Sequence, residues 1–189
     1  MKLSDLVIIK SGRTFKNGIT EHAAPSHQVI QLRDVESGTI DWERLVSVNI
    51  ETTRTVKTIQ HDQIIVVAKG PLKKAVQVCH PPSENIVATQ HFLVITNNNS
   101  EVLLSRFLTF YLNSDPVQQW LNGNSGGSYQ STLSISNLSK LPFPKLSIEQ
   151  QQLILEGVDS VEKEISLHEL LIHERRMQLN EIVGALITK

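Results

Sequence analysis

The C-terminal stretch "SIEQQQLILEGVDSVEKEISLHELLIHERRMQLNEIVGALI", residues 147–187, decides how this chain is built. It contains no proline, and only Gly157 and Gly184 weaken a helix within it. Its opening "SIEQ" has the S-x-x-Q form of a capping box, which satisfies backbone N–H groups at a helix start. The preceding "LPFP", residues 141–144, disfavours helix because each proline biases the residue before it toward an extended backbone. We therefore expect a helix from 147 to 187, roughly 60 Å long at 1.5 Å per residue.

Apolar residues recur every seven positions along this predicted helix. The a positions are Val158, Ile165, Ile172, Leu179 and Leu186, and the d positions are Val161, His168, Arg175 and Ile182. Such a seam is typical of a coiled coil, here with a polar centre. A helix packed on its own domain is the alternative, but 60 Å is long beside a domain whose radius of gyration is about 15 Å. We therefore expect a projecting helix that pairs with a partner. Further apolar residues beside the seam, Leu167, Leu170, Leu171, Val183 and Ile187, widen this face.

Residues 1–146 show a different pattern, with short runs rich in Val and Ile between turn sequences. Residues 28–35, 62–70, 74–79 and 91–96 are predicted strands. A helix is predicted after Ser100, its cap, and Asp115-Pro116 ends it and opens a short second turn to Leu121. We thus expect an α+β chain. A β-rich domain with mixed or antiparallel strands occupies residues 1–146, and one long helix that forms a coiled coil occupies residues 147–189.

Composition and charge narrow the class of protein. The chain has 40% hydrophobic and 20% charged residues, as globular proteins do. Its longest apolar run, Ile64–Ala68, is far shorter than the roughly 20 residues of a membrane helix, so we expect no membrane association and no leader. Cys79 has no second cysteine to pair with, which fits a buried thiol in a reducing cytoplasm. Residues 1–146 carry 14 Lys and Arg against 11 Asp and Glu, whereas residues 147–189 carry 4 against 8. A polyanion would therefore meet the first part.

Motifs for catalysis are missing from the sequence. The stretch "HPPS" lacks the flanking residues of an adenine methyltransferase motif, and "AKGPLKK" lacks the second glycine and the Lys-Ser/Thr of a P-loop. No HExxH is present, and His168 and His173 are five residues apart, a spacing that does not place two ligands on one helix face. We expect neither catalysis nor a metal in this chain.

Several stretches, taken in order, resemble the specificity (S) subunit of type I restriction–modification systems. They are "LVIIKSGRTFKNG", "VIQLRDVESGTID", "IQHDQIIVVAKGPLKKAVQV", "IVATQHFLVI", "LLSRFLTFYLNS" and "GNSGGSYQSTLSISNLSKLPFPKLSIEQQQLI". Phe15 stands where proline is common in the family, and His61-Asp62 replaces the usual Gly-Asp. Typical S subunits carry two recognition domains and two long helices that pair antiparallel, whereas this chain resembles half of one.

The resemblance implies a non-catalytic subunit that binds double-stranded DNA and directs adenine methylation by methyltransferase (M) subunits. S-adenosylmethionine would be held by the M subunits, and ATP with Mg by restriction (R) subunits, with no cofactor in this chain. Residues 1–146 would be the target-recognition domain, and residues 147–189 the helix for dimerisation and M-subunit docking. A two-fold homodimer would read an interrupted palindrome.

Candidate DNA-binding residues lie in the polar loops of the first domain. They are Arg13, Lys16, Lys69, Lys73, Lys74, Gln90, Gly126, Gly127, Ser128, Tyr129, Gln130 and Ser131. The run "NGNSGGSYQS", residues 122–131, is read as a loop whose glycines, Gly123 included, let the backbone approach DNA, although a plain connecting loop or disorder remain alternatives. The dimer and partner contacts are expected at the nine a and d residues named above.

Other functions remain open at the level of sequence. A half-size subunit can dock on an M or full S subunit as a decoy or regulator without productive DNA reading. It can also serve a different type of restriction system, or be a fragment of a two-domain S subunit. The bases recognised do not follow from the sequence, because they depend on loop side chains whose geometry it does not show.

Overall fold

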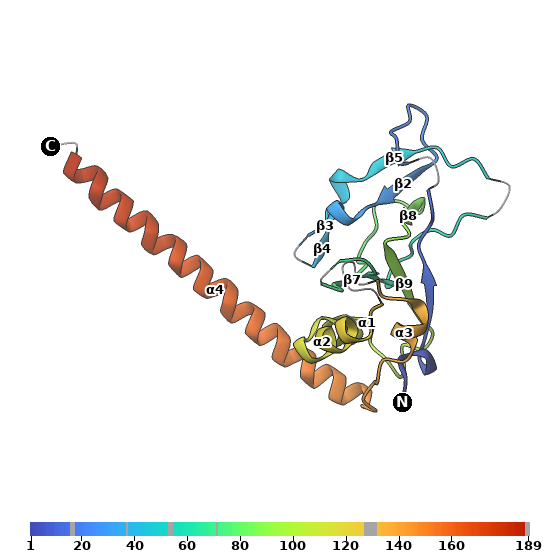
Figure 1. Ribbon diagram of the computed structural model, residues 1–189. Coiled ribbons are helices and arrows are strands. Elements are labelled where there is room, and N and C mark those ends of the chain that lie inside the picture. Colours follow the sequence, from blue (N-terminus) through green and yellow to red (C-terminus); the bar gives the residue numbers. More distant parts are fainter. Residues whose placement is uncertain (16–17, 37, 53–54, 71, 127–131, 188–189) are drawn as a thin grey trace. The chain divides into compact units, whose positions relative to one another are not determined.

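The computed structural model describes residues 1–189 except 16–17, 37, 53–54, 71, 127–131 and 188–189 (Figure 1). The chain divides into two compact units, Met1–Ile148 and Glu149–Lys189. The first unit combines three small sheets with short helices, and the second is helical. The predicted α+β class is confirmed.

A four-stranded antiparallel sheet forms the larger part of the first unit. Its order is β1 (Val7–Ser11), β9 (Phe92–Asn97), β6 (Ile64–Val67) and β7 (Ala75–Gln77). Helix α1 (Ser105–Asn113) contacts β7, and α3 (Ile135–Ser139) contacts β1. Burial of the Val- and Ile-rich strands stabilises the sheet, since Ile64, Ile65 and Val66 are all buried.

A three-stranded sheet packs beside the first. Its order is β5 (Val46–Val48), β2 (His27–Ile30) and β8 (Ile86–Ala88), with β2 antiparallel to β5 and parallel to β8. Its mixed strand directions match the expected mixed topology. One buried cluster joins the two sheets, with Ile30 and Ile86 from the second packed near Ile65 and Phe92 from the first. The positions of the two sheets are therefore coupled.

Short elements complete the first unit. They are the hairpin β3 (Val35–Glu36) and β4 (Thr39–Ile40), the 3-10 helices η1 (Leu3–Asp5), η2 (Leu32–Asp34) and η3 (Trp42–Arg44), and helix α2 (Asp115–Gly123). Helix α2 has proline in its first turn, where the missing N–H leaves no helix bond unmade. The predicted second helical turn after Asp115-Pro116 is thus confirmed, and Gly123, expected in the following loop, is its last residue.

The start of α1 differs from the prediction. The helix begins at Ser105 and not at a cap on Ser100. The Asn99 side chain accepts from Glu101 N (3.0 Å), and the Asn97 amide donates to Leu103 O (2.6 Å). These side-chain bonds give the backbone of residues 99–103 an alternative to helical bonding. The Ser105 hydroxyl instead donates to Asp62 Oδ2 (2.7 Å).

Four strands and one cysteine also differ from the sequence interpretation. The predicted strands contain β2, β6, β7 and β9, but β1, β4, β5 and β8 are absent from that set. Each of these four has a single neighbour in its sheet, and none is longer than five residues, which is too short a run to leave a clear pattern. Cys79, expected to be buried, is exposed.

The second unit consists of α4, which begins at Ile148 and runs for 40 residues to Ile187. This agrees with the helix predicted from 147 to 187. The seam residues are largely exposed within the single chain, with Ile165 53% and Ile172 52% exposed. On the same helix His168 Nε2 lies 3.8 Å from Glu164 Oε1, and Arg175 donates to Gln178 Oε1 (3.0 Å). Across the described residues, no helix combines the length and apolar character needed to cross a membrane.

Candidate nucleic-acid interface

One end of the four-stranded sheet gathers most of those predicted DNA-binding residues that the structure describes. Strands β1 and β6 end there, and β7 and β9 begin there, as the pairs Ser11–Leu93, Val67–Phe92 and Val66–Ala75 show. Residues just beyond these strand ends must emerge together. Arg13, Lys69, Lys74 and Gln90 therefore lie at the same end of the sheet, although they are far apart in sequence.

Backbone hydrogen bonds hold the emerging segments side by side. The bonds run from Arg13 N to Ala88 O (2.7 Å), Gln90 N to Arg13 O (2.8 Å), Ala68 N to His91 O (2.7 Å) and Leu133 N to Ala68 O (2.8 Å). They join the segment after β1, the turn between β8 and β9, the end of β6 and the segment that follows the glycine-rich loop. We call this arrangement the sheet end.

Close backbone approach at the sheet end requires glycine at position 12. A Cβ at Gly12 would lie 2.1 Å from Thr89 O and 2.7 Å from Ala88 O, far inside any real contact. Both neighbours are backbone atoms, so no side chain can move aside. Gly12 thus allows Arg13 to lie directly beside the β8–β9 turn.

A recess of about 440 Å³ opens at the sheet end. Its lining residues are Arg13, Phe15, Gly18, Ile19, Gln31, Leu32, Arg33, Thr89, Gln90 and His91. None of these described residues is acidic, and Arg13 and Arg33 supply positive charge. We refer to this hollow as the recess. Its wall combines cations, neutral hydrogen-bonding groups and apolar side chains, which is a lining suited to a polyanion with polar, planar groups.

Two residues that line the recess each carry a buried polar atom without a partner. Within the described part of the chain, Gln31 Nε2 and Thr89 Oγ1 have no hydrogen-bond partner. Thr89 as a residue is only 6% exposed. The neighbouring Gln90 is partly engaged, since its Oε1 accepts from the Thr14 hydroxyl (2.9 Å). Buried polar groups in folded proteins normally have partners, so these two atoms call for an explanation.

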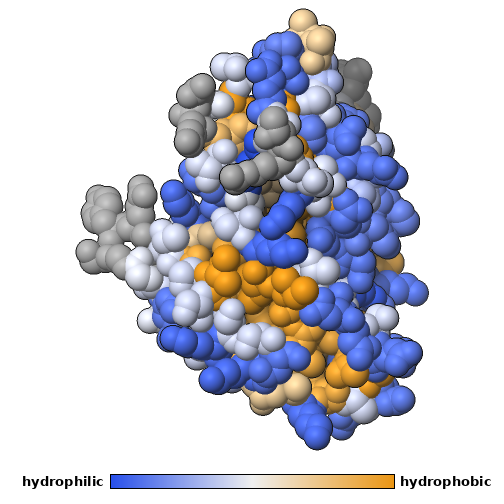
Figure 2. All heavy atoms as spheres, turned by 90° about the vertical axis from the view of Figure 1, so that its right-hand side faces the viewer, coloured by the Kyte–Doolittle hydropathy of each residue, from blue (hydrophilic) through white to orange (hydrophobic). Residues whose placement is uncertain are grey.

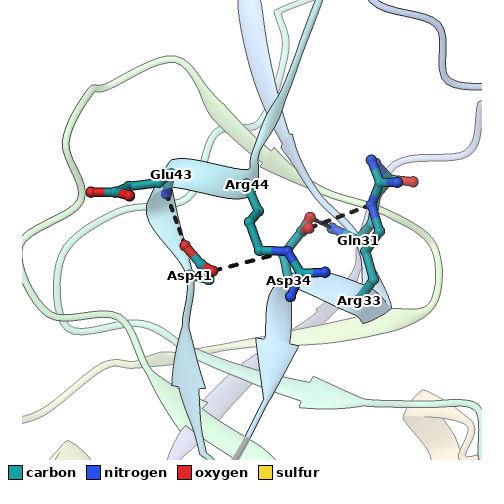
Figure 3. A network of polar contacts seen from close by, with 6 residues as sticks. All are labelled: Gln31, Arg33, Asp34, Asp41, Glu43 and Arg44. Carbon is teal, nitrogen blue, oxygen red and sulfur yellow. Dashed lines mark hydrogen bonds and ion pairs between the residues drawn. The ribbon is translucent and has the colours of Figure 1, made fainter.

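Asp34 positions two residues of the recess. Its Oδ2 accepts from Gln31 N (2.7 Å), and its Oδ1 lies 3.6 Å from Arg33 Nε (Figure 3). Burial raises the pKa of Asp34, while the bond from Gln31 N and the charges of Arg33 and Arg44 oppose that shift. Arg44 also approaches Asp41, with Nε 4.0 Å from Oδ2. The carboxylate closes the η2 turn, and this turn places Gln31 and Arg33 at the recess.

A larger cleft of about 810 Å³ adjoins the recess through Arg13, which lines both. Lys10 and Lys57 add positive charge, and the remaining polar lining consists of Ser11 and Thr14, Thr52, Thr55, Thr58, Gln60, Gln63 and Thr96. Figure 2 shows one face of the molecule, on which a patch of apolar side chains is bordered by hydrophilic ones. The described lining of the cleft also contains no acidic residue. Cations and hydroxyl groups of this kind suit a phosphate backbone.

The ends of the glycine-rich loop also reach the sheet end. Thr132 forms bridges with both Lys69 and Gly126, and Gly126 and Thr132 exchange backbone hydrogen bonds of 3.0 and 3.3 Å. Lys69, Lys74 and Gly126 are exposed. The predicted contacts Lys16, Gly127, Ser128, Tyr129, Gln130 and Ser131 lie outside the described residues.

Lys73 is a correction to the predicted interface. Its side chain is 0% exposed, and Nζ donates to Ala68 O (3.2 Å) and Gly70 O (2.6 Å). Burial lowers its pKa. A side chain enclosed in this way cannot reach a phosphate, so the predicted DNA contact by Lys73 is wrong. Lys73 instead stabilises the turn that carries Lys69.

Sequence reasoning also missed residues of the recess. Gln31 and Arg33 fell inside a predicted strand over residues 28–35, whereas β2 ends at Ile30 and η2 follows. The sequence did contain a signal for the helical turn η2, because an aspartate three residues after Gln31 can accept a hydrogen bond from the Gln31 backbone at the start of a helix. Thr89 and His91 carried no such local signal, since their placement depends on pairing between distant segments.

Comparisons with known proteins found one matching family model and several solved structures of similar fold. A family model described as the type I restriction modification DNA specificity domain matches residues 1–174. No curated protein matches the chain. Among solved structures, the HsdS subunit from Thermoanaerobacter tengcongensis is similar at a TM-score of 0.67 and 18% identity, over 90% of this chain and 43% of that chain.

Two further solved structures are similar. One is from a study of complex assembly and conformational transition of the type I R-M system (TM-score 0.66, 20% identity, 90% of this chain and 43% of that chain). The other is the S subunit of a type I restriction–modification system from M. genitalium (TM-score 0.55, 16% identity, 88% and 39%). At such identities the likeness shows the fold alone. The chain spans about two-fifths of the length of these structures.

Proposed function

Because the chain belongs to the type I restriction modification DNA specificity domain family, we propose that it is the DNA-reading subunit of such a system. The first unit binds one half of a double-stranded target through the sheet end, and partner subunits perform the chemistry. The observation that carries this proposal is the convergence of Arg13, Lys69, Gln90 and the ends of the glycine-rich loop at one place. Convergence of distant basic and amide side chains, beside a recess whose described lining contains no acidic residue, favours a nucleic acid.

The charge of this surface supports binding that depends on partners. The recess and the cleft together present Lys10, Arg13, Arg33 and Lys57. If each neutralises one phosphate, the affinity falls with salt at a logarithmic slope of roughly −4. Few phosphate contacts mean weak binding by this chain alone, so M subunits are expected to close around the same DNA. They would hold S-adenosylmethionine, and R subunits would use ATP and Mg.

The exposed seam of α4 supports a homodimer. A parallel pair would place Arg175 against Arg175 of the second copy and Glu164 near Glu169 of the second copy, two repulsive contacts. An antiparallel pair avoids both. In the register that pairs Ile165 with Ile182 of the second copy, Glu169 meets the oppositely charged Arg176.

This register also sets the reach of the dimer. Its two-fold axis passes between His173 and Glu174, so the two helix starts at Ile148 lie roughly 75 Å apart along the helices. Two identical domains attached to such a spacer read two inverted half-sites. The expected target is an interrupted palindrome.

Methylation mapping tests the proposed function. The chain is co-expressed with the M subunits of its own system, and modified adenines are located across the genome. The expected result is methylation confined to one interrupted palindrome. An asymmetric or ungapped target would rule out the homodimer, and methylation without sequence preference would rule out the reading role.

The exposed face of α4 also fits a second function. The helix alone can dock on an M subunit or on a full S subunit, and the chain would then act as a decoy or regulator. Methylation by the host system would in that case fall when the chain is added, with no new target sequence. A new target sequence favours the reading role instead.

A further inference from the structure

Two unsatisfied atoms of residues that line the recess are suited to pair with a ligand. Gln31 Nε2 and Thr89 Oγ1 are buried without partners among the described residues, and Thr89 is more than nine-tenths buried. A buried polar atom without a partner lowers the stability of the fold. A ligand that forms hydrogen bonds with both atoms would therefore recover this lost free energy. Both residues line the same recess.

The surroundings of these atoms specify the chemistry of that ligand. Arg13 and Arg33 provide cations at the recess, and Arg13 is held 6.0 Å above the ring of Phe15. The apolar residues Ile19 and Leu32 form part of the same wall. A ligand with a phosphate, a planar donor–acceptor edge and a methyl group would satisfy all three features. An A·T pair in the major groove presents such an edge, with N7 and N6 on adenine and a methyl group on thymine.

We propose that the recess receives the major-groove edge of one A·T pair in each half-site, with Gln31 and Thr89 as the specificity-determining residues. The Gln31 amide pairs with adenine, as glutamine amides commonly do. The Thr89 hydroxyl pairs beside it, and Ile19 and Leu32 contact the thymine methyl group. Arg13 and Arg33 bind the flanking phosphates. This inference rests on the proposed DNA-reading function and adds the residues and the base pair read.

A selection experiment tests the inference. The full chain with its M subunits is incubated with duplex DNA that is randomised over the target region, and bound sequences are counted. The variants are Thr89→Val, which keeps the shape and removes the hydroxyl, and Gln31→Met, which keeps the length and removes the amide. The matched controls are Thr109→Val and Gln77→Met, whose side chains bond to Ser105 O and Asp62 Oδ1 away from the recess.

The expected result is loss of preference for A·T at one shared position of each half-site, by roughly 5- to 150-fold, with the other positions unchanged. Because Thr89 Oγ1 has no partner in the described chain, the melting temperature of Thr89→Val should not fall. The control variants should select the wild-type sequence.

Other results would overturn the inference. Unchanged preference at every position in both variants would show that the recess does not read a base. An equal loss at all positions would show that the two residues only support the fold or bind phosphate. If the wild-type complex itself selects no sequence, the proposed function fails together with this inference.

Discussion

Substitution of Gly12 by alanine should separate the segments that form the sheet end. The added Cβ would lie 2.1 Å from Thr89 O, so the segment after β1 must move away from the β8–β9 turn. This movement disrupts three backbone bonds, from Gly12 N to Phe92 O (3.0 Å), Arg13 N to Ala88 O (2.7 Å) and Gln90 N to Arg13 O (2.8 Å). The recess depends on the same contacts.

The expected cost follows from these contacts. Overpacking costs about 1–3 kcal/mol, and each weakened hydrogen bond adds up to about 1 kcal/mol. We expect the free energy of unfolding of the first unit to fall by about 3 kcal/mol or more. For a unit of this size, that corresponds to a melting temperature lower by roughly 6–12 °C.

Tryptophan fluorescence measures the effect on the first unit alone, because Trp42 and Trp120 both lie within Met1–Ile148. The matched control is Gly123→Ala at the end of α2, where a new Cβ meets nothing within 4 Å and alanine favours helix. This control should melt at or above the wild-type temperature. A Gly12→Ala protein that melts with the wild type and keeps its DNA selectivity would refute the reasoning.

Two further predictions concern the seam and the buried lysine. The double substitution Ile165→Asp and Ile172→Asp should give a monomer in sedimentation velocity, while the unfolding of the first unit measured by tryptophan fluorescence stays unchanged. Lys163→Asp on the outer face of the helix is the control and should leave the dimer intact. A dimer that persists in the double variant would contradict the assignment of the seam. Burial lowers the pKa of Lys73 in the folded state, so the unfolded chain binds the Lys73 proton more tightly than the folded chain does. The free energy of unfolding should therefore increase as pH rises from the folded pKa toward 10.5, the pKa of the unfolded chain. Urea titrations across this alkaline range should show a smaller rise for Lys73→Met than for wild type or the exposed control Lys74→Met, and equal rises would contradict the assignment.

Local patterns explain which elements were predictable. The helix α4 carries its own signals, a capping-box sequence at Ser147 and apolar residues at heptad spacing, so its extent matched the prediction. Strands β6 and β9 are central in their sheet, and the resulting burial leaves Val- and Ile-rich runs. The edge strands β1 and β5 lack that burial and were missed.

The candidate site was predictable only in part. Basic and amide residues in polar loops indicated Arg13, Lys69 and Gln90, which the structure brings to one sheet end. Lys73 belonged to the same pattern, yet its side chain is enclosed by the turn that it stabilises. A lysine in a loop sequence has no local feature that distinguishes a surface cation from a buried donor to carbonyl oxygens.

The sequence by itself determined the long C-terminal helix with its heptad seam, the β-rich character of the first unit and the opposite charge of the two parts. These properties depend on residues within a few turns or strands of one another. The tertiary structure alone decided that Arg13, Gln31, Thr89 and Gln90 share one recess, and that Lys73 does not belong to it. The physical reason is strand register: pairing between segments far apart in the chain places their ends together, and no local pattern encodes which ends will meet.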